Sequence, residues 1–444
     1  MRIFFSVGEP SGDLHGSNLI RRLKSQDPSL EFVGFGGPKM EKAGCELHYE
    51  LTTMAVMFLE ALKNIRFFFK LIAQAETYFK TNQVDAVVLI DFPGFNWWIA
   101  RKAKKHNIPV FYYGVPQMWA WAPWRVRKIR KFVDHVICKL PFEVDWFAKR
   151  KCHATYVGHP YFDQLKTQTY DESFVSQLSG ETSGQRLLTL LPGSRDQEVR
   201  SVLPVLLRAT SQILSETKNC RVAIASYNER QREMSEKILA EAIESDLETN
   251  ETAADFLLTN VELYVGKTPE LMKASHVCLA CSGSVSLELL QHRKPTVIVF
   301  KVKRWVMLAQ ALMLRTKFIT LVNLIGANDI QKKTWRPYDP EQDEPSFKEA
   351  NQGDVRPRAV MPEYLTSGDP SGKVAKRILH WLNDEAAYRA KVDTMDALAL
   401  EYAKPGATNR AADYILLELQ KLSDKSNADS NNKPVETFLE RSAA

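Results

Sequence analysis

The sequence predicts an α/β protein made of two consecutive doubly wound domains, each with a parallel sheet covered by helices on both faces. Short runs rich in β-branched and aromatic residues alternate with amphipathic helical stretches, and the alternation starts again after a polar stretch. The run at 85–91 (DAVVLID) is apolar between its end residues, which is typical of a strand buried on both faces of a parallel sheet. We therefore expect two Rossmann-like domains with a cleft between them.

Length and composition agree with this class. A chain of 444 residues is long enough for two domains of about 200 residues each. The content of 45% hydrophobic and 25% charged residues excludes a disordered chain, a collagen-like chain and an integral membrane bundle. The charge of +6 is only mildly basic. Six irregularly spaced cysteines and an N-terminal apolar run too short for a signal peptide predict a cytosolic protein with reduced thiols.

The first domain is expected to span residues 1–165. Its predicted strands lie at 2–8, 31–36, 85–91, 109–114, 134–140 and 155–158. Amphipathic helices fit between them, at 14–26, 62–80 and 96–106.

A polar, irregular stretch at 166–185 is interpreted as the linker to a second domain at 186–380. Predicted strands in that domain lie at 186–191, 221–226, 261–265, 277–280 and 296–300. A polar insertion at 331–358, with several prolines and many charges, predicts a long surface loop. Helices are expected at 381–421, and the segment 422–444 has so little apolar content that it predicts a disordered tail.

Two turns of the first domain carry polar residues where a strand ends. In VGEPSGDLHG the glycines let the backbone approach a ligand, and the polar candidates are Glu9, Ser11, Gly12 and Asp13. Ser11 and Asp13 are expected to cap the next helix, and a GxGxxG dinucleotide fingerprint is absent. Asp91 ends the most buried strand, at the edge where open α/β sheets bind ligands, and is a candidate general base. Both patterns are equally compatible with ordinary turns that bind no ligand.

A third turn, LLPGSRDQEV, opens the second domain. Gly193 and Ser194 lie between a strand and a helix, so the backbone N–H groups at the helix start are candidates for holding an anion. Arg195 adds a guanidinium group whose geometry suits phosphate. The alternative is a surface arginine in a capped turn.

A fourth turn, CSGSVSLELL, places Ser282, Gly283 and Ser284 between a strand and a helix. Small residues there expose backbone N–H groups to a diphosphate, and Glu288, one helical turn further on, could accept from both hydroxyls of a ribose. An ordinary helical glutamate is the alternative. The nearby CxxC at Cys278 and Cys281 has no second pair at zinc spacing, so we expect packed thiols and no metal site.

Basic and aromatic residues occur together in three stretches. Between residues 101 and 151 there are 13 Lys and Arg against 3 Asp and Glu, with Arg127 and Lys128 inside WAWAPWRVRKIRKF. IRFFFKLI contains Phe67, Phe68 and Phe69, and the third stretch is KVKRWVMLAQALMLRTKF at 301–318. Such mixtures suit an anionic lipid interface. Packed helix faces beside solvated charges are the alternative, and nucleic acid is a competing partner that no RNA-binding signature supports.

The motifs together resemble lipid-A-disaccharide synthase, an inverting glycosyltransferase family with the GT-B fold. The resemblance covers about residues 1–420 and is carried, in chain order, by GEPSGDLHG, IDFPGFN, WAWAPWRVRKIRKFVD, LPFE, VGHP, LLPGSRDQEV, CSGSVSLE, VNLI, PEYL and GATNRAA. It implies transfer from UDP-2,3-diacylglucosamine to 2,3-diacylglucosamine 1-phosphate, which gives the β-1',6-linked lipid A disaccharide 1-phosphate and UDP. It also implies a metal-independent enzyme without a cofactor, peripheral on the cytosolic face of the inner membrane, that can form homodimers.

The resemblance also implies residue roles. Asp91 would be the catalytic base on the acceptor 6-hydroxyl. The donor-binding residues would be Gly193, Ser194, Arg195, Ser282, Gly283, Ser284, Glu288 and Asn323. The residues facing the acceptor or its sugar would be Glu9, Ser11, Gly12, Asp13 and Asn96. Membrane contact is assigned to Phe67, Phe68, Phe69, Arg127 and Lys128.

Other functions remain as alternatives. Another GT-B enzyme, such as a UDP-N-acetylglucosamine 2-epimerase or a MurG-like transferase, would share the fold, but an epimerase would leave the apolar patches unexplained. A non-enzymatic membrane-binding or RNA-binding protein would use only the basic surface. A nicotinamide oxidoreductase is disfavoured because the dinucleotide fingerprint is missing.

Overall fold

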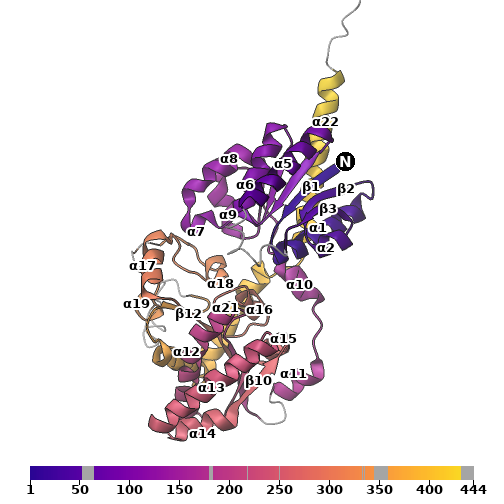
Figure 1. Ribbon diagram of the computed structural model, residues 1–444. Helices are drawn as coiled ribbons and strands as arrows, with labels where there is room; N and C mark the ends of the chain where they lie inside the picture. Colours follow the sequence, from indigo (N-terminus) through magenta and orange to yellow (C-terminus); the bar gives the residue numbers. More distant parts are fainter. Residues whose placement is uncertain are drawn as a thin grey trace, which may run out of the picture. The chain divides into compact units, whose positions relative to one another are not determined.

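The computed structural model describes residues 1–52, 65–179, 184–217, 219–249, 251–332, 334, 336–344 and 359–431. The chain divides into two compact units. The first unit comprises Met1–Met118, Trp124–Pro160 and Gly406–Ala444, and the second comprises Trp119–Pro123 and Tyr161–Pro405. Figure 1 shows strands and helices in both units.

The first unit is built on a seven-stranded parallel sheet with the order β3-β2-β1-β4-β5-β6-β7. Its strands are β1 (Arg2–Val7), β2 (Glu31–Gly36), β3 (Cys45–Glu50), β4 (Ala86–Ile90), β5 (Val110–Tyr113), β6 (His135–Cys138) and β7 (Ala154–Tyr156). Its helices are α1 (Pro10–Gln26), α2 (Pro38–Lys42), α5 (Ile65–Thr81), α6 (Pro93–Lys105), α8 (Val126–Phe132), α9 (Pro141–Ala148) and α22 (Ala407–Asn431). The start of the helix predicted at 62–80 lies outside the described residues.

Strand β1 shows why these sequences form a sheet buried on both sides. Its successive side chains point to opposite faces. Ile3 and Phe5 belong to the core cluster that also contains apolar residues of α1 and α22, whereas Phe4 packs edge-on against Phe79 of α5, 4.9 Å between ring centroids. Strand β4 is buried along its whole length, as its apolar sequence predicts.

The second unit contains a six-stranded parallel sheet with the order β10-β9-β8-β11-β12-β13. Its strands are β8 (Arg186–Leu191), β9 (Cys220–Ser226), β10 (Val261–Val265), β11 (Val277–Cys281), β12 (Thr296–Lys301) and β13 (Glu363–Thr366). Its helices are α10 (Tyr161–Thr167), α11 (Glu172–Leu178), α12 (Asp196–Glu216), α13 (Glu229–Thr249), α14 (Glu251–Asn260), α15 (Thr268–Ala274), α16 (Val285–Gln291), α17 (Arg304–Met313), α18 (Leu321–Ile325), α19 (Pro340–Asp343), α20 (Ser371–Asn383) and α21 (Glu385–Tyr402). Helix α7 (Met118–Trp121) begins at the last residue of the first unit's first segment and continues in the second unit. The 3-10 turn Pro123–Arg125 follows it.

Two strands and the linker differ from the sequence-based expectation. Strands β3 and β13 were not predicted, because β3 (CELHYE) is a polar edge strand and β13 has only four residues. The segment 166–185 was interpreted as an irregular linker, yet it contains α11, which packs on α15 and is tied to it by the ion pair between Glu172 and Lys273.

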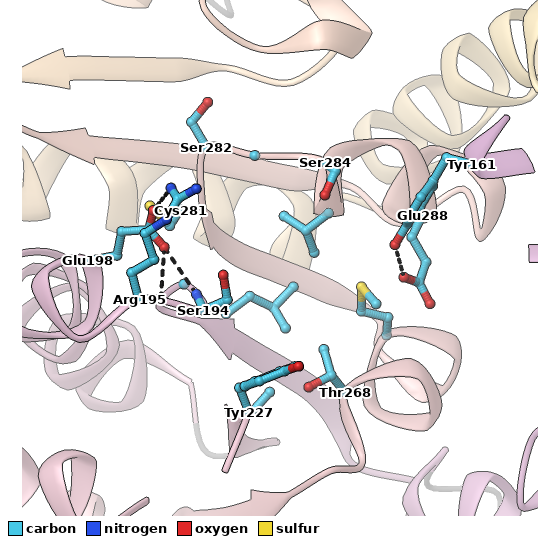
Figure 2. A pocket seen from close by; sticks show the side chains of 16 residues that line it. Tyr161, Ser194, Arg195, Glu198, Tyr227, Thr268, Cys281, Ser282, Ser284 and Glu288 are labelled. Atoms are coloured by element: carbon cyan, nitrogen blue, oxygen red, sulfur yellow. Dashed lines mark hydrogen bonds and ion pairs between the residues drawn. The ribbon is translucent and has the colours of Figure 1, made fainter. Parts of the chain in front are cut away.

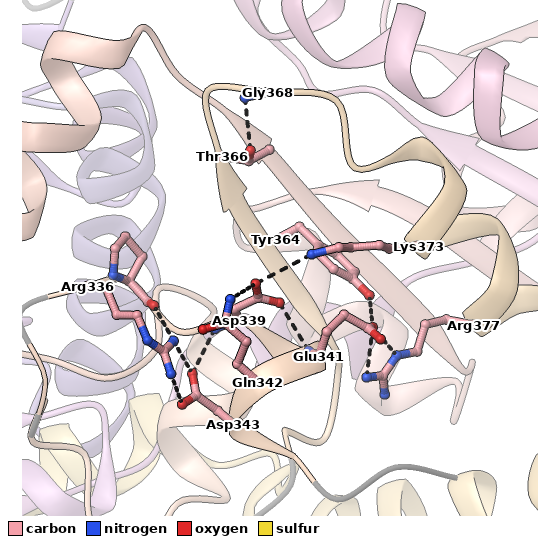
Figure 3. A network of polar contacts seen from close by, with 11 residues as sticks. Arg336, Asp339, Glu341, Gln342, Asp343, Tyr364, Thr366, Gly368, Lys373 and Arg377 are labelled. Atoms are coloured by element: carbon pink, nitrogen blue, oxygen red, sulfur yellow. Dashed lines mark hydrogen bonds and ion pairs between the residues drawn. The ribbon is translucent and has the colours of Figure 1, made fainter.

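The described part of the insertion at 331–358 is not a simple surface loop, which corrects the prediction. It contains α19, and both Tyr338 and Glu344 are buried. The guanidinium group of Arg377 from α20 donates to Glu344 (2.9 Å) and to Glu341 (3.1 Å). Figure 3 shows the part of this network around Glu341, to which Tyr364 of β13 also donates. The buried Arg377–Glu344 ion pair, with the more exposed Arg377–Glu341 pair, therefore holds this polar segment against the body of the unit.

The tail prediction was also wrong in part. Helix α22 continues to Asn431, so residues 422–431, expected to be disordered, are helical. The N-terminal half of α22 packs in the core of the first unit through Ala411, Ile415 and Leu419. A helix anchored in this way extends into a polar sequence that composition alone assigns to disorder. Residues 432–444 lie outside the described part.

We predict that Gly34→Ala lowers the free energy of unfolding by about 2–4 kcal/mol. Gly34 of β2 has φ +138°, and a Cβ atom there would lie 2.1 Å from the carbonyl oxygen of Phe5 on the paired strand. The control is Gly94→Ala in the first turn of α6, where a Cβ meets no atom within 4 Å. We expect that control to be neutral or to stabilise by about 0.5–1 kcal/mol. Equal urea unfolding midpoints for the two variants would contradict the prediction.

Candidate functional site

A cavity of about 380 Å³ lies in the second unit, at the carboxyl ends of β8 and β11. These strands are parallel neighbours, so the turns that follow them meet at one edge of the sheet. Figure 2 shows the side chains that line the cavity. Seven of the eight predicted donor-site residues are among them: Gly193, Ser194, Arg195, Ser282, Gly283, Ser284 and Glu288.

Sequence reasoning missed several further lining residues, among them Tyr161, Glu198, Tyr227 and Thr268. Tyr227 directly follows β9, and Thr268 begins the helix after β10. Both therefore lie at the same edge of the sheet. Because open α/β sheets bind ligands at the carboxyl ends of their strands, examining the residues after every strand could have found them. No local pattern marks Tyr161.

The turn before α12 is organised around Glu198. The Glu198 carboxylate accepts the backbone N–H groups of Ser194 (3.0 Å) and Arg195 (3.1 Å), and Arg195 also donates to it through its guanidinium group (2.8 Å). A Cβ on Gly193 would lie 2.6 Å from Glu198, and Gly193 has φ +119°, so only glycine fits this turn. The helix start expected to hold a ligand anion thus already holds an internal carboxylate. The Arg195 side chain remains 81% exposed.

The turn before α16 is open. Gly283 and Ser284 are exposed, and a Cβ on Gly283 would meet no atom within 4 Å. A ligand can therefore approach the backbone of this turn closely. The preceding CxxC cysteines, Cys278 and Cys281, are both buried in β11 as packed thiols, as predicted.

Glu288 is not an ordinary exposed helical glutamate. It lines the cavity, yet only 4% of it is exposed. Its carboxylate accepts from the hydroxyl of Tyr161 (2.9 Å) and from the side-chain amide of Gln168 (3.4 Å). Burial raises the pKa of Glu288, and these two hydrogen bonds act in the opposite direction.

Asn323 is placed away from this cavity, unlike the other predicted donor residues. It is buried in α18, and its amide nitrogen donates to the carbonyl of Met361 (2.7 Å) and to Glu363 (3.0 Å). Its amide oxygen accepts from the N–H of Met361 (2.8 Å). Both ends of the amide group hydrogen-bond to the protein itself. The geometry therefore favours a role for Asn323 in holding α18 to Met361 and Glu363 over direct contact with the donor.

In the first unit, Asp91 follows β4 at the carboxyl edge of the sheet. Asp91 and Phe92 both have left-handed backbones, with φ 45° and 44°. The main-chain carbonyl of Asp91 accepts from the hydroxyl of Tyr112 (2.7 Å) and from the side chain of Asn96 (2.9 Å). The Asp91 carboxylate is 25% exposed and lies 3.3 Å from the ammonium group of Lys139.

Asn96 holds this turn in place. It is fully buried, and its amide nitrogen lies within hydrogen-bond distance of the carbonyls of Ser6, Ile90 and Asp91, while its amide oxygen accepts from the Ser6 hydroxyl (2.6 Å). No polar atom of its side chain is left for a ligand. The prediction that Asn96 contacts the acceptor is therefore corrected to a role in positioning Asp91.

The four candidates near the start of the chain separate into two groups. Glu9 and Ser11 are exposed at the start of α1, whereas Gly12 and Asp13 are buried. Asp13 accepts the backbone N–H groups at the start of α2, from residues Gly37, Lys39 and Met40. The expected caps are also wrong: α1 begins at Pro10, so Ser11 and Asp13 lie inside the helix, and no side chain caps it. Asp13 joins two helices and leaves Glu9 and Ser11 as the accessible pair.

Titratable groups gather around Asp91. Burial and the carboxylates of Asp91 and Glu9 raise the pKa of Tyr112 well above its usual value. Burial and the positive charge of Lys139 hold the pKa of His159 well below its usual value, so its imidazole is neutral. Lys139 was missed by sequence reasoning, although it follows β6 at the same sheet edge.

The exposed aromatic surface of the first unit is smaller than the predicted membrane contact would require. Phe67 and Phe68 are half-buried: Phe67 packs on Tyr49, and Phe68 packs on Phe95. Phe69 is 50% exposed and lies beside Trp98, which is 41% exposed. Trp124 is 60% exposed, and Arg127 and Lys128 are exposed on α8.

Comparison with known proteins places this chain in a family. Residues 3–337 match the family model described as lipid-A-disaccharide synthetase. A lipid-A-disaccharide synthase of Coxiella burnetii is 30% identical over 364 residues, which cover 82% of this chain and 88% of the relative. Another, of Geobacter sulfurreducens, is 28% identical over 422 residues, which cover 94% and 97%. The chain belongs to the lipid-A-disaccharide synthase family.

Solved structures agree on the fold. The UDP co-structure of S. aureus MnaA covers 94% of this chain and 97% of its own, with a TM-score of 0.56 and 13% identity. Acinetobacter baumannii MurG covers 94% and 99%, with a TM-score of 0.51 and 12% identity. Identities this low show the fold alone. The predicted GT-B fold class is confirmed.

Family membership also confirms the predicted function, a glycosyltransferase of lipid A biosynthesis acting on a UDP-sugar and an acceptor. It decides against the epimerase, nucleic-acid-binding and oxidoreductase alternatives. Every helix in the described part of the chain is too short or too polar to span a bilayer.

We predict that the affinity for a UDP-sugar falls as the pH drops from neutral toward the raised pKa of Glu288. Protonation of the buried carboxylate removes a charged acceptor, and the raised pKa brings this loss to a higher pH than usual. UDP-N-acetylglucosamine is a suitable soluble probe in calorimetry, because its diphosphate diester does not titrate in this range. Glu288→Gln should bind about tenfold or more weakly at neutral pH and lose the pH dependence. An identical pH profile in the variant would remove Glu288 from the binding site.

Proposed function

We propose that the cavity of the second unit binds the UDP part of the diacylglucosamine donor. The observation that carries this proposal is that the two strand-end turns and Glu288 line one cavity. The open backbone at Gly283 and Ser284 and the exposed guanidinium group of Arg195 suit a diphosphate. Glu288, fixed by Tyr161 and Gln168, suits the two hydroxyls of a ribose.

We further propose that the carboxyl edge of the first unit's sheet binds 2,3-diacylglucosamine 1-phosphate, with Asp91 as the general base. Asp91 takes the proton of the acceptor 6-hydroxyl, and the oxygen attacks the anomeric carbon of the donor on the face opposite UDP. The bond between that carbon and the diphosphate oxygen breaks, UDP leaves, and the configuration inverts to give the β-1',6 linkage. Lys139, 3.3 Å from the carboxylate, orients Asp91, and Glu9 and Ser11 are accessible to the acceptor.

Asp91→Asn should reduce turnover by roughly 10²–10⁴-fold, because the amide cannot accept the hydroxyl proton. The measurement is UDP release in mild detergent, with both lipid substrates present and the disaccharide product identified by mass. Asp145→Asn, an exposed aspartate on α9 of the same unit, is the matched control and should retain full turnover. Near-wild-type turnover in Asp91→Asn would exclude Asp91 as the base.

Both lipid substrates are amphiphilic, and we propose that the protein works at the cytosolic surface of the inner membrane. The exposed rings of Phe69, Trp98 and Trp124, with Arg127 and Lys128, form the aromatic-basic patch of the first unit. Aromatic rings favour the interfacial region of a bilayer, and cations are attracted to anionic headgroups.

Charge reversal in Arg127→Glu/Lys128→Glu should weaken binding to anionic vesicles by about tenfold or more. The control is Lys39→Glu/Lys42→Glu on α2, which makes the same change in net charge at two exposed lysines of the same unit. Thermal unfolding checks that both variants fold. Co-sedimentation equal to that of the control would exclude the aromatic-basic patch as a membrane contact.

A further inference from the structure

Helix α17 of the second unit is apolar but not buried. Its sequence, RWVMLAQALM, has a single charged residue, and none of its side chains that the structure describes is buried. Trp305, Leu308 and Leu312 recur at spacings of three and four residues, so they share one face of the helix. Their exposed fractions are 70%, 61% and 73%, and Met313 on the same face is 51% exposed. An apolar helix is normally buried, so this face is shaped for contact with something beyond its own unit.

A large groove runs beside this helix. Its volume is about 1140 Å³, and it is lined by α12 on one side and by the end of β12 and the start of α17 on the other. Apolar side chains of its α17 side include Val302, Trp305 and Val306. The exposed apolar face and the groove therefore share Trp305.

The groove carries strong positive charge. Seven Lys and Arg side chains line it, against the two carboxylates of Asp196 and Glu198. Both carboxylates are already paired, Glu198 with Arg195 and Asp196 with Arg230. Within the described residues, four of the cations have no ion-pair partner: Arg200, Lys301, Lys303 and Arg304. Unneutralised cations next to an exposed apolar face are complementary to a surface that is anionic outside and apolar inside.

We propose that α17 and the basic groove beside it form a docking surface for an anionic lipid bilayer. The helix lies in the interface plane, with Trp305, Leu308, Leu312 and Met313 inserted among the acyl chains. Lys301, Lys303, Arg304 and Arg200 contact the phosphates of lipid headgroups. This surface belongs to the second unit and is distinct in sequence from the aromatic-basic patch of the first. It deepens the membrane association proposed above and rests on it.

The composition of the surface distinguishes a bilayer from other occupants. Nucleic acid would use the cations but leave two exposed leucines and a methionine in water. A second copy of the chain would bury the apolar face but bring the four unpaired cations of each copy together in a symmetric contact, which is unfavourable. An anionic bilayer offers headgroup phosphates to the cations and acyl chains to the apolar face at the same time.

The test uses the full-length protein and vesicles of phosphatidylcholine and phosphatidylglycerol in a two-to-one ratio. Leu308→Ser/Leu312→Ser removes the apolar part, and Lys303→Glu/Arg304→Glu reverses the charged part. Matched controls in the same unit are Leu258→Ser/Leu400→Ser, at leucines that are 60% and 63% exposed, and Lys376→Glu/Lys404→Glu, at two exposed lysines. Thermal unfolding checks that all four variants fold.

We expect about tenfold or more weaker co-sedimentation for each α17 variant than for its control. The charge-reversal variant should also lose the salt dependence that the wild-type protein shows. Two results would overturn the proposal. One is binding equal to that of the controls. The other is concentration-dependent self-association without vesicles that Leu308→Ser/Leu312→Ser abolishes, because a second copy would then cover the helix. Turnover of the wild-type protein on detergent-dispersed substrates tests the proposed function separately, since it needs no bilayer.

Discussion

Parallel pairing of fully buried strands is the constraint on which the rest of both units depends. A parallel sheet covered on both faces favours strands such as AVVLI of β4, which is apolar along its whole length, and TVIVFK of β12, whose first four residues are buried. It also brings the carboxyl ends of all its strands to one edge. Residues far apart in sequence, such as Ser194 and Ser284, then line one cavity because the strands before them are neighbours. The same geometry brings Asp91 of one strand end to Lys139 of another.

Turns at that edge need polar groups for their backbone, and acidic side chains supply them repeatedly. Glu198 accepts two successive N–H groups before α12, and Glu143 accepts those of Lys139 and Leu140 before α9. Each carboxylate fixes a turn that could not be satisfied by strand or helix bonds alone. The ligand-facing groups can then be presented on turns that are already rigid.

This use of polar side chains to hold turns explains which candidate residues remain accessible to a ligand and which do not. The strand ends were visible in the pattern, and β2, β8 and β10 have the predicted bounds. Asp13, Asn96 and Asn323 occur in the same motifs as the ligand candidates, but each has its hydrogen-bonding capacity filled by nearby backbone or side-chain groups. One-dimensional spacing shows that a polar residue follows a strand, whereas its partners depend on which other turn lies beside it. Tertiary packing also determined the helical end of α22 and the burial of Glu344 by Arg377, where composition alone indicated disorder and a surface loop.

Exposed apolar surface raises the free energy of a protein in water by about 25 cal/mol for each Å². A chain that keeps Phe69, Trp98 and Trp124 exposed in one unit, and Trp305, Leu308 and Leu312 exposed in the other, carries that cost twice. In both places Lys or Arg side chains accompany the apolar ones, namely Arg127 and Lys128, and Lys303 and Arg304. Cations keep such a face soluble and make it selective for anionic headgroups over other apolar partners. A catalyst whose donor and acceptor both carry acyl chains benefits from binding where those lipids are concentrated, and we propose that this pairing of charge with apolar area provides that binding. Every helix in the described chain is too short or too polar to span a membrane.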